Sequence, residues 1–534
     1  MRTWIMITAA VMIIVMGLYG SAVLVFNEDR LKGLLAMHVE RDTGRRIEVR
    51  GDLKVRFFPG LRLEAQAVEI SGPAARAGPS MLEAEFMEMN LRLLPMIRGE
   101  LQASEVRLRG ARINLASGLS ESGPIEGMLD PLQASDAGPP WLDGPIAVDD
   151  VMINLSDAMG VRQEQFSVDR IELEGFAVGE PLQFRFRGNV GDPALFDWLE
   201  IDGVMVPGAD GQFRLTNMLM TGSMEEGHFD IELLGTLEVN AGPPLTASLD
   251  SGRLRINEHE FQARVDYSAF DQPYVNLDLS SDFIDLNVAA LPSLLSEHLG
   301  ARSDSRLVAG LQAIDFDLAV GVAQVAREGL VLKDLELQAQ ARERRLTVDR
   351  LAAVVPGGYL SALGVVEMAS SGWSSELGLR IDGDDFDALA QSIPLAWGPG
   401  GSGSLSLALL LESGTASAGP RIGGEGGLEL WNGSWNVLES LTPGALPRET
   451  AGAFEFLSSP IRIASGVITF PELQYVNEEV VGQGELSLAW PPGAIDGALD
   501  MTHEDELLRV QISGGLPKPR LQWRRLSSPE GGPR

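Results

Sequence analysis

Residues 45–71, RRIEVRGDLKVRFFPGLRLEAQAVEIS, decide the fold class of this chain. Apolar residues fall on one parity, first at Ile47, Val49, Leu53, Val55 and Phe57, and after the turn at Pro59–Gly60 again at Leu61, Leu63, Ala65 and Ala67. A period of two is typical of a β-strand that buries one face. The stretch therefore predicts paired strands whose apolar side chains share one face of a sheet.

The rest of the chain repeats this pattern. Alternating runs follow every ten to fifteen residues as far as residues 521–523, with Gly, Pro, Asn or Asp between them. Separate sandwiches, a β-solenoid and one long twisted sheet are the three candidate architectures. The absence of a fixed short repeat and the scarcity of linkers favour one long, mostly antiparallel sheet of sequential hairpins. About 25 strands at roughly 4.8 Å each would extend on the order of 120 Å.

Changes in composition divide the chain into segments. Short helices are predicted near residues 286–299 and 385–396, where leucines and alanines follow helical spacing. The predicted divisions are an anchor with a short cytoplasmic end (1–27), a first module of helix and strands (28–116), a Gly/Pro/Ser-rich loop or linker (117–145), an extended β body (146–440), a C-terminal β region (441–526) and a polar tail (527–534).

The net charge excludes several classes of partner. With 75 acidic against 42 basic residues the chain has a net charge of −33. Nucleic acids and anionic lipid headgroups bind proteins with a positive electrostatic field. No cysteine is present, so disulfides and thiolate chemistry are excluded. We therefore predict no nucleic-acid partner.

The N-terminus predicts a membrane anchor. Residues 4–26 carry no charge and are long enough to cross a hydrocarbon core of roughly 30 Å as a helix. A cleavable signal peptide ending near residues 20–22 is the alternative. The weak positive charge before the span predicts a cytoplasmic N-terminus and an exported body. A helix from Asn27 to Gly44 should follow, either capping the first strands or lying on the membrane surface.

We find no catalytic motif in the sequence. The glycines of GPGGSG (Gly398, Gly400 and Gly403) precede a strand rather than a helix, so they predict a loop instead of a dinucleotide site. The acidic residues at 382–387 lack calcium-loop spacing and predict a solvated turn that opens a helix. We predict no enzymatic activity, no catalytic residue, no cofactor and no bound metal.

The distinctive feature is an apolar face repeated over many strands. For a single strand a buried sandwich core is the simpler interpretation, but few helices are available to cover the whole face. The candidate groove residues are Ile47, Val49, Leu53, Val55, Phe57, Phe184, Phe186, Ile231, Leu233, Leu335, Leu337, Leu405, Leu407, Leu486 and Leu488. This face must either close on itself or hold an apolar ligand.

Four short motifs near the N-terminus resemble one known family. They are TGR at residues 43–45, I-x-V-x-G-D-L at 47–53, F-P-G-L at 58–61 and L-L-P-x-x-x-G-E-L at 93–101. Together they resemble the N-terminal module of the AsmA family, and residues 452–499 are similar to the family's C-terminal region. The chain departs from the family pattern after residues 426–441, where relatives have a longer helical insertion.

The resemblance implies a location, a shape and a function. It implies a single-pass protein of the inner (cytoplasmic) membrane of a Gram-negative-type cell, whose periplasmic body forms an elongated, taco-like apolar β-groove. It further implies phospholipid transport between the inner and outer membranes, a role in outer-membrane integrity, and a partner protein in the periplasm or outer membrane. The alternative is an assembly scaffold for outer-membrane proteins or an envelope complex that carries no lipid.

Overall fold

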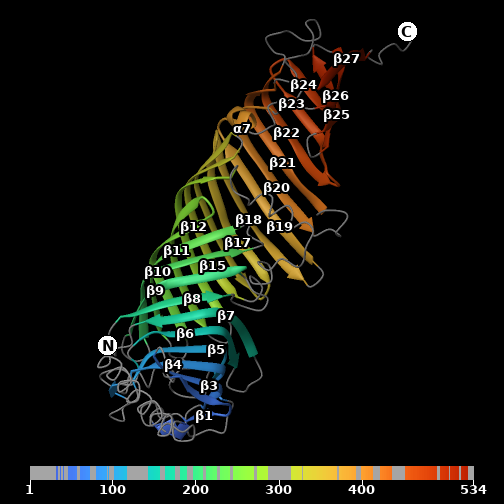
Figure 1. Ribbon diagram of the computed structural model, residues 1–534. Coiled ribbons are helices and arrows are strands. Elements are labelled where there is room, and N and C mark those ends of the chain that lie inside the picture. Colours follow the sequence, from blue (N-terminus) through green and yellow to red (C-terminus); the bar gives the residue numbers. More distant parts are fainter. Residues whose placement is uncertain are drawn as a thin grey trace, which may run out of the picture. The chain divides into compact units, whose positions relative to one another are not determined.

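The computed structural model is mainly β (Figure 1). Its described residues form 27 strands of mixed, mostly antiparallel open sheet, together with the short helix α7 (Phe386–Ser392). The structure describes residues 32–33, 36–37, 40, 46–56, 60–71, 80–92, 94–95, 102–116, 142, 144–156, 163–174, 181–188, 196–207, 212–224, 229–240, 245–269, 273–286, 314–327, 329–369, 372–392, 399–412, 421–435, 452–489, 493–503, 506–515 and 519–526.

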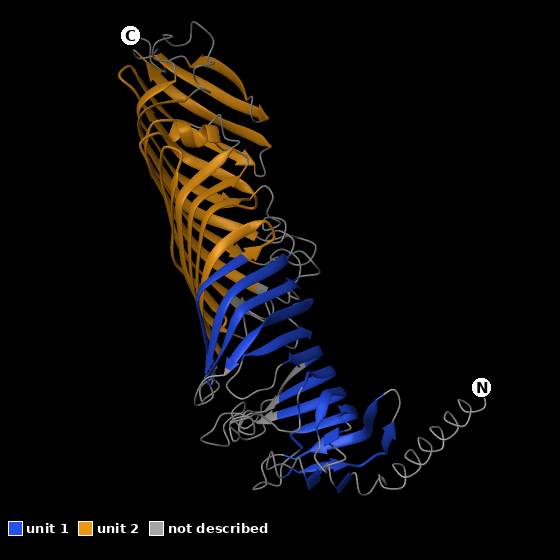
Figure 2. Cartoon of the chain, turned by 60° about the vertical axis from the view of Figure 1, so that its left-hand side comes forward, with its two compact units in different colours: residues 1–254, 266–271 blue, residues 255–265, 272–534 orange. Residues whose placement is uncertain are grey.

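The chain divides into two compact units, coloured separately in Figure 2. Unit 1 comprises Met1–Leu254 with Asp266–Asp271, and unit 2 comprises Arg255–Val265 with Gln272–Arg534. Strands β12 (Leu245–Ile256) and β13 (His259–Ala269) are divided between the units.

The strands of unit 1 are joined mainly in chain order. They are β1 (Ile47–Val49), β2 (Leu53–Arg56), β3 (Leu61–Ile70), β4 (Leu82–Leu91), β5 (Ala103–Ala116), β6 (Ile146–Ser156), β7 (Gln163–Glu174), β8 (Leu182–Gly188), β9 (Trp198–Pro207), β10 (Gln212–Met224) and β11 (Phe229–Asn240). Strands β1 and β2 both pair with β3, and from β3 to β11 each strand pairs with the next.

Unit 2 continues the same arrangement from β14 to β27. Its strands are β14 (Pro273–Asp285), β15 (Asp315–Arg327), β16 (Leu330–Arg342), β17 (Arg345–Val355), β18 (Gly358–Ala369), β19 (Gly372–Gly383), β20 (Ser402–Glu412), β21 (Arg421–Ser434), β22 (Ala453–Ala464), β23 (Val467–Val476), β24 (Val480–Ala489), β25 (Ala494–His503), β26 (Glu506–Gly515) and β27 (Arg520–Leu526). Each pairs with its successor in the chain.

The sheet is mostly antiparallel, as predicted, and two strand pairs are parallel. Strand β6 runs parallel to β5, and β15 runs parallel to β14. A parallel partner requires a crossover of about a dozen residues or more. Residues 117–145 and 286–314 are the two long connections that make these crossovers possible. Residues 287–299 of the predicted helix near 286–299 lie outside the described residues, whereas the helix predicted near 385–396 is present as α7.

The predicted alternation holds along the strands except where a left-handed residue shifts it. In β3, Leu61, Leu63 and Ala65 are buried as predicted, but Ala67 is exposed and Val68 is buried. Ala67 has φ 50°, in the left-handed region, and the register with β4 is the same on both sides of it. The left-handed residue takes one place in the alternation, so that Val68 rather than Ala67 lies on the buried face.

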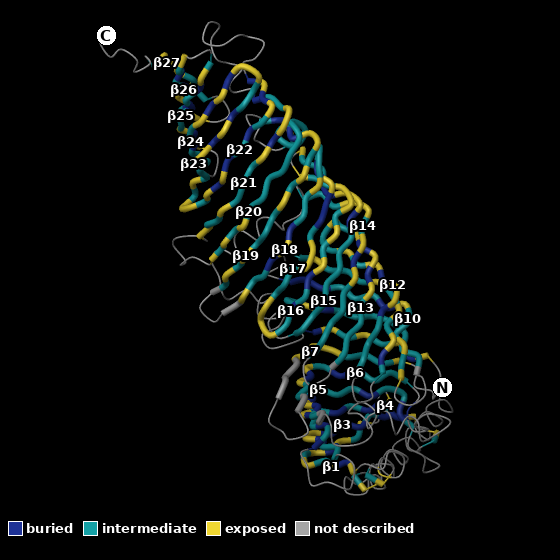
Figure 3. The backbone as a smooth tube through the Cα atoms, turned by 180° about the vertical axis from the view of Figure 1, so that it is seen from behind, coloured by how far each residue is buried: buried dark blue, intermediate teal, exposed yellow. Residues whose placement is uncertain are grey.

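Each unit has a closed core at one part of its sheet. In unit 1 the core lies on β1–β7 and includes Leu53, Leu63 and Met89. In unit 2 it lies on β21–β26 and α7, and includes Leu499 and Ile512, both fully buried. On β14–β20 most apolar side chains are only half-buried (Figure 3). The apolar face of unit 2 is therefore closed at the C-terminal strands and more open before them.

The N-terminal helix is confirmed where it is described. Residues 32, 33, 36, 37 and 40 are helical. Ala36 packs against the unit 1 core, and Lys32 donates a hydrogen bond from Nζ to the Gly51 carbonyl at 2.9 Å. The predicted span at residues 4–26 lies outside the described part. Among the described residues, no helix has the length and hydrophobicity needed to cross a membrane.

Candidate functional site

The candidate site is an apolar face built by the strand register of unit 2. Residues directly opposite each other on neighbouring strands point to the same side of a sheet. One row across β14–β20 consists of Leu279, Val320, Leu337, Leu351, Ala362, Leu379 and Leu407. The next row consists of Leu277, Leu318, Ala339, Val348, Gly364, Leu377 and Leu409. We call these two rows the open apolar face.

Most large side chains of the open apolar face retain contact with solvent. Its leucines and valines are half-buried, with the exception of Leu279, which is 8% exposed. In the closed core of the same unit, Leu457, Leu499 and Ile512 are at most 1% exposed. In the described part of the chain, every extensive backbone contact between elements joins hydrogen-bonded neighbouring strands.

The opposite side of the same strands is polar. Arg350 forms an ion pair with Glu336 at 2.9 Å across β16 and β17. Arg380 donates two hydrogen bonds to Asp382, at 2.6 and 2.7 Å, and these bonds hold the pKa of the Asp382 carboxyl below its usual value. Unit 2 therefore has one solvated face and one apolar face, as the alternation predicts.

Glycines of β21 allow leucines of β20 to lie flat over the neighbouring strand. A Cβ atom built on Gly426 would lie 2.9 Å from Cδ2 of Leu407 and 2.0 Å from the Ser406 carbonyl oxygen. At Gly424 it would lie 3.1 Å from Cδ2 of Leu409. Any side chain at these positions would therefore displace leucines of the open apolar face.

Helix α7 marks the boundary between the open apolar face and the closed core. Its first turn is capped by Asp385, whose Oδ1 accepts a hydrogen bond from the Ala388 amide at 3.1 Å. The Asp385 amide donates to the Gly357 carbonyl at 3.1 Å, and the Phe386 amide donates to the Gly401 carbonyl at 2.8 Å. These bonds hold the helix against β17–β18 and β20, with Phe386 buried in the core.

The capping bonds explain the acidic residues at 382–387. Asp382 is paired with Arg380, and Asp385 caps the helix, which confirms the predicted turn. Among the described residues, no group of three or more His, Asp or Glu is placed to hold a metal ion. In the glycine-rich loop, the Gly400 amide donates to the Ser434 carbonyl and Gly403 is the second residue of β20, whereas Gly398 lies outside the described residues.

An apolar pocket of about 180 Å³ lies beneath α7. We call it the α7 pocket. Every residue that lines it is apolar: Phe386, Leu389, Ala390, Pro399, Leu405, Leu428, Leu430, Trp435, Leu457, Ile461, Phe470, Leu473 and Leu486. The lining comes from α7, the loop before β20, strands β20–β24 and Trp435 just after β21.

The structure brings only some of the predicted groove residues together. Leu335, Leu337, Leu405 and Leu407 lie half-buried on the same side of unit 2, whereas Leu486 and Leu488 are 3% exposed in its closed core. In unit 1 the buried core contains Ile47 and Leu53, with Val49 and Val55 packed against it. Phe184, Phe186, Ile231 and Leu233 are half-buried on β8 and β11, and Phe57 lies outside the described residues.

Sequence reasoning missed several residues of the site. Leu377 and Leu379 belong to the open apolar face on β19, and the alternating run ELGLR at residues 376–380 was a signal that could have identified them. Trp435 and Phe470 in the α7 pocket had no such signal. Their positions depend on packing between strands and α7 rather than on alternation within one strand.

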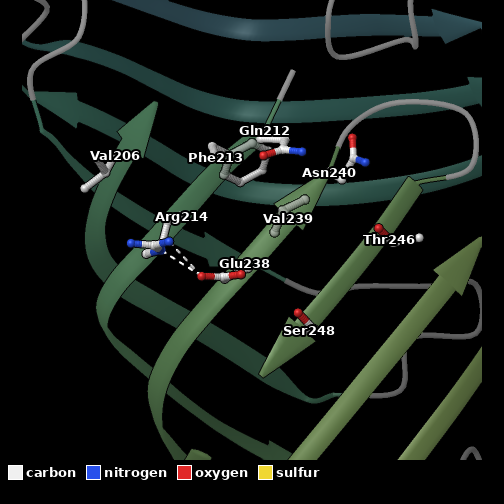
Figure 4. A pocket seen from close by; sticks show the side chains of 9 residues that line it. All are labelled: Val206, Gln212, Phe213, Arg214, Glu238, Val239, Asn240, Thr246 and Ser248. Carbon is white, nitrogen blue, oxygen red and sulfur yellow. Dashed lines mark hydrogen bonds and ion pairs between the residues drawn. The ribbon is translucent and has the colours of Figure 1, made fainter. Parts of the chain in front are cut away.

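A second pocket, in unit 1, is polar (Figure 4). It measures about 370 Å³ and is lined by residues of β9–β12, among them Gln212, Asn240 and Thr246. Arg214 and Glu238 on its wall form an ion pair with each other at 2.8 Å. The charged groups of this pocket therefore pair with each other. Its lining mixes polar and apolar side chains, unlike the open apolar face.

The most strongly perturbed titratable group has a structural explanation. Burial raises the pKa of Tyr475 to about 12. Its hydroxyl donates a hydrogen bond to the Ala453 carbonyl and accepts one from Nδ2 of Asn477 at 3.2 Å. The ring therefore remains neutral at physiological pH and joins β22 to β23, with no role in proton transfer.

The fold and the open apolar face together define a class of protein: a mainly β protein in which the described residues leave an apolar sheet face of unit 2 partly exposed. The N-terminal part is similar to a known family, because residues 2–125 match the model of the AsmA family. Proteins of this family are cell-envelope proteins whose functions are generally non-enzymatic. Comparisons with curated proteins and with solved structures give no match.

Proposed function

We propose that this chain is an inner-membrane-anchored periplasmic protein that shields phospholipid acyl chains on an apolar β-groove. In this proposal it takes part in phospholipid transport between the inner and outer membranes and in outer-membrane integrity. The observation that carries the proposal is the open apolar face, with two apolar rows across seven strands of unit 2. The AsmA family domain supports a function in the cell envelope.

The energetics of lipid transfer fit such a face. Keeping acyl carbons out of water contributes about 0.8 kcal/mol per CH₂. A two-chain lipid with roughly thirty methylenes therefore faces a barrier on the order of 20 kcal/mol in water. Half-buried leucines arranged in register can contact the hydrocarbon along the length of an acyl chain. A bound acyl chain also removes the exposed apolar surface of these leucines from water.

The composition of the open apolar face favours sliding over fixed binding. Its rows contain only Leu, Val, Ala and Gly, none of which has a hydrogen-bonding side chain. Contact with an acyl chain is consequently non-directional, and neighbouring positions along the face are nearly equivalent in energy. No residue on this face supplies a nucleophile or a proton donor, so transport rather than turnover is the activity that we propose.

The proposal assigns the remaining parts of the chain to the envelope. Residues 4–26 serve as the anchor in the inner membrane, and the body lies in the periplasm as an elongated, taco-like groove. The helix after the anchor closes the groove end nearest the bilayer, consistent with Ala36 packing on the unit 1 core. A partner protein in the periplasm or outer membrane binds the end of the body that lies away from the anchor.

Detergent-free purification followed by native mass spectrometry tests the function. We expect the full-length protein to carry co-purified phospholipid, seen as added masses that solvent extraction identifies as lipid. A protein that remains lipid-free after extraction from lipid-replete membranes would contradict the proposal. That result would instead favour the non-lipid-carrying assembly scaffold, whose apolar face would be covered by a protein partner.

A further inference from the structure

The α7 pocket differs from the open apolar face in one respect: it is enclosed on several sides. Helix α7 lines it with Phe386 and Leu389, and strands β22 and β24 line it with Leu457 and Leu486. Leu457 and Leu486 also belong to the closed core, where they are at most 3% exposed. Because this core is packed, an apolar chain that enters the pocket finds no further space beyond these side chains.

The pocket is continuous with the open apolar face. Leu405 lines the pocket, and Leu407, two residues further along β20, belongs to the open apolar face. Residues two apart on a strand point to the same side of the sheet. Leu405 is also paired with Ile381, which neighbours Leu379 of the same face in the same way. Hydrocarbon lying over Leu379 and Leu407 thus has a direct path beneath α7.

The size and lining of the pocket determine what it can hold. An apolar cavity of about 150 Å³ stays dry and accepts a ligand as large as benzene. The α7 pocket, at about 180 Å³, should therefore accept about six carbons of a hydrocarbon chain. None of the thirteen lining residues is charged, so a phosphate-bearing headgroup would be buried there without a partner.

We infer that the α7 pocket binds the methyl end of a phospholipid acyl chain and forms the blind end of the open apolar face. This inference rests on the proposed lipid-binding function. The bound chain lies with its methyl end beneath α7 and its carboxyl end, with the headgroup, toward β19 and the preceding strands. Helix α7 acts as a fixed stop, because its first turn is held by backbone hydrogen bonds to Gly357 and Gly401.

Trp435 provides a reporter inside the pocket, since it lines the cavity and is 2% exposed. The experiment uses the full-length protein loaded with phosphatidylcholine that bears a nitroxide either at the methyl end or near the carboxyl end of one chain. Comparison with Trp435→Phe isolates the fluorescence of this residue from the other tryptophans. We expect the methyl-end nitroxide to quench Trp435 and the carboxyl-end nitroxide to leave it unquenched.

A matched pair of variants on α7 tests the pocket itself. Ala390 lines the pocket and Ala388 does not, so Ala390→Phe should fill the cavity whereas Ala388→Phe should leave it open. We expect loss of methyl-end quenching in the first variant and its retention in the second. If lipid is bound, as counted by nitroxide spin, but quenches Trp435 equally from both positions or not at all, the inference is wrong and the proposed function stands. If no lipid is bound, both are wrong.

Discussion

Replacement of Leu409 by aspartate should weaken phospholipid binding by about tenfold or more, whereas the same change at Leu410 should leave binding unchanged. The two leucines are neighbours on β20 but point to opposite sides of the sheet. Leu409 is paired with Leu377 on the open apolar face, and Leu410 is paired with Glu376 on the polar face. Placing an ionised carboxylate against hydrocarbon costs at least about 2 kcal/mol, which exceeds one tenfold step in affinity.

The control is well matched because the Leu410 side chain is already 54% exposed, so its replacement by aspartate removes little buried apolar surface. Binding would be measured by titration with a fluorescent phospholipid, with circular dichroism to verify that both variants keep their β-structure. Equal loss of binding in the two variants would mean that the lipid does not distinguish the faces. Equal retention would remove β20 from the binding surface.

Replacement of Leu499 by alanine should destabilise unit 2 by about 2–5 kcal/mol, the usual cost of a large-to-small change in a packed core. Leu499 is completely buried, between strands β24 and β26. Replacement of Leu379 by alanine should cost only about 1 kcal/mol, because part of this side chain already faces solvent and less hydrocarbon is removed from a buried site.

Urea denaturation of lipid-free protein, monitored by circular dichroism, would provide the comparison. A large difference between the two midpoints is expected if only the C-terminal strands of unit 2 form a closed core. Similar destabilisation by Leu379→Ala and Leu499→Ala would indicate that the open apolar face is packed by the chain itself. That outcome would leave no surface for a lipid.

Local alternation was sufficient to predict most strands and the side of the sheet on which many leucines lie. In the segment at residues 330–342, the apolar residues Leu335 and Leu337 alternate with Glu336 and Gln338, and the structure keeps that pattern. The alternation exists because the side-chain period of a strand is two, whatever its partner. The sequence was therefore informative about each strand taken separately.

Strand direction and closure were not predictable from the same pattern. The parallel pairs β5–β6 and β14–β15 depend on long crossovers, and an alternating strand reads the same in either direction. Leu486 and Leu407 have the same local pattern of alternation, yet Leu486 is 3% exposed and Leu407 is half-buried. The difference arises because Leu486 packs in the closed core of β22–β26 and α7, whereas Leu407 lies outside it. The left-handed conformation of Ala67, which moves the buried position to Val68, likewise has no signal in the alternation.

The most direct test of the open apolar face is photo-crosslinking of lipid at successive positions of β20. A photoreactive amino acid would be placed in turn at Leu407, Ala408, Leu409 and Leu410 of the full-length protein in cells, and crosslinked phospholipid would be identified by mass spectrometry. The register places Leu407 and Leu409 on the open apolar face and Ala408 and Leu410 on the polar face. We predict lipid adducts at the first two positions and none at the other two. Adducts at all four positions, at none, or only at Ala408 and Leu410 would contradict the account.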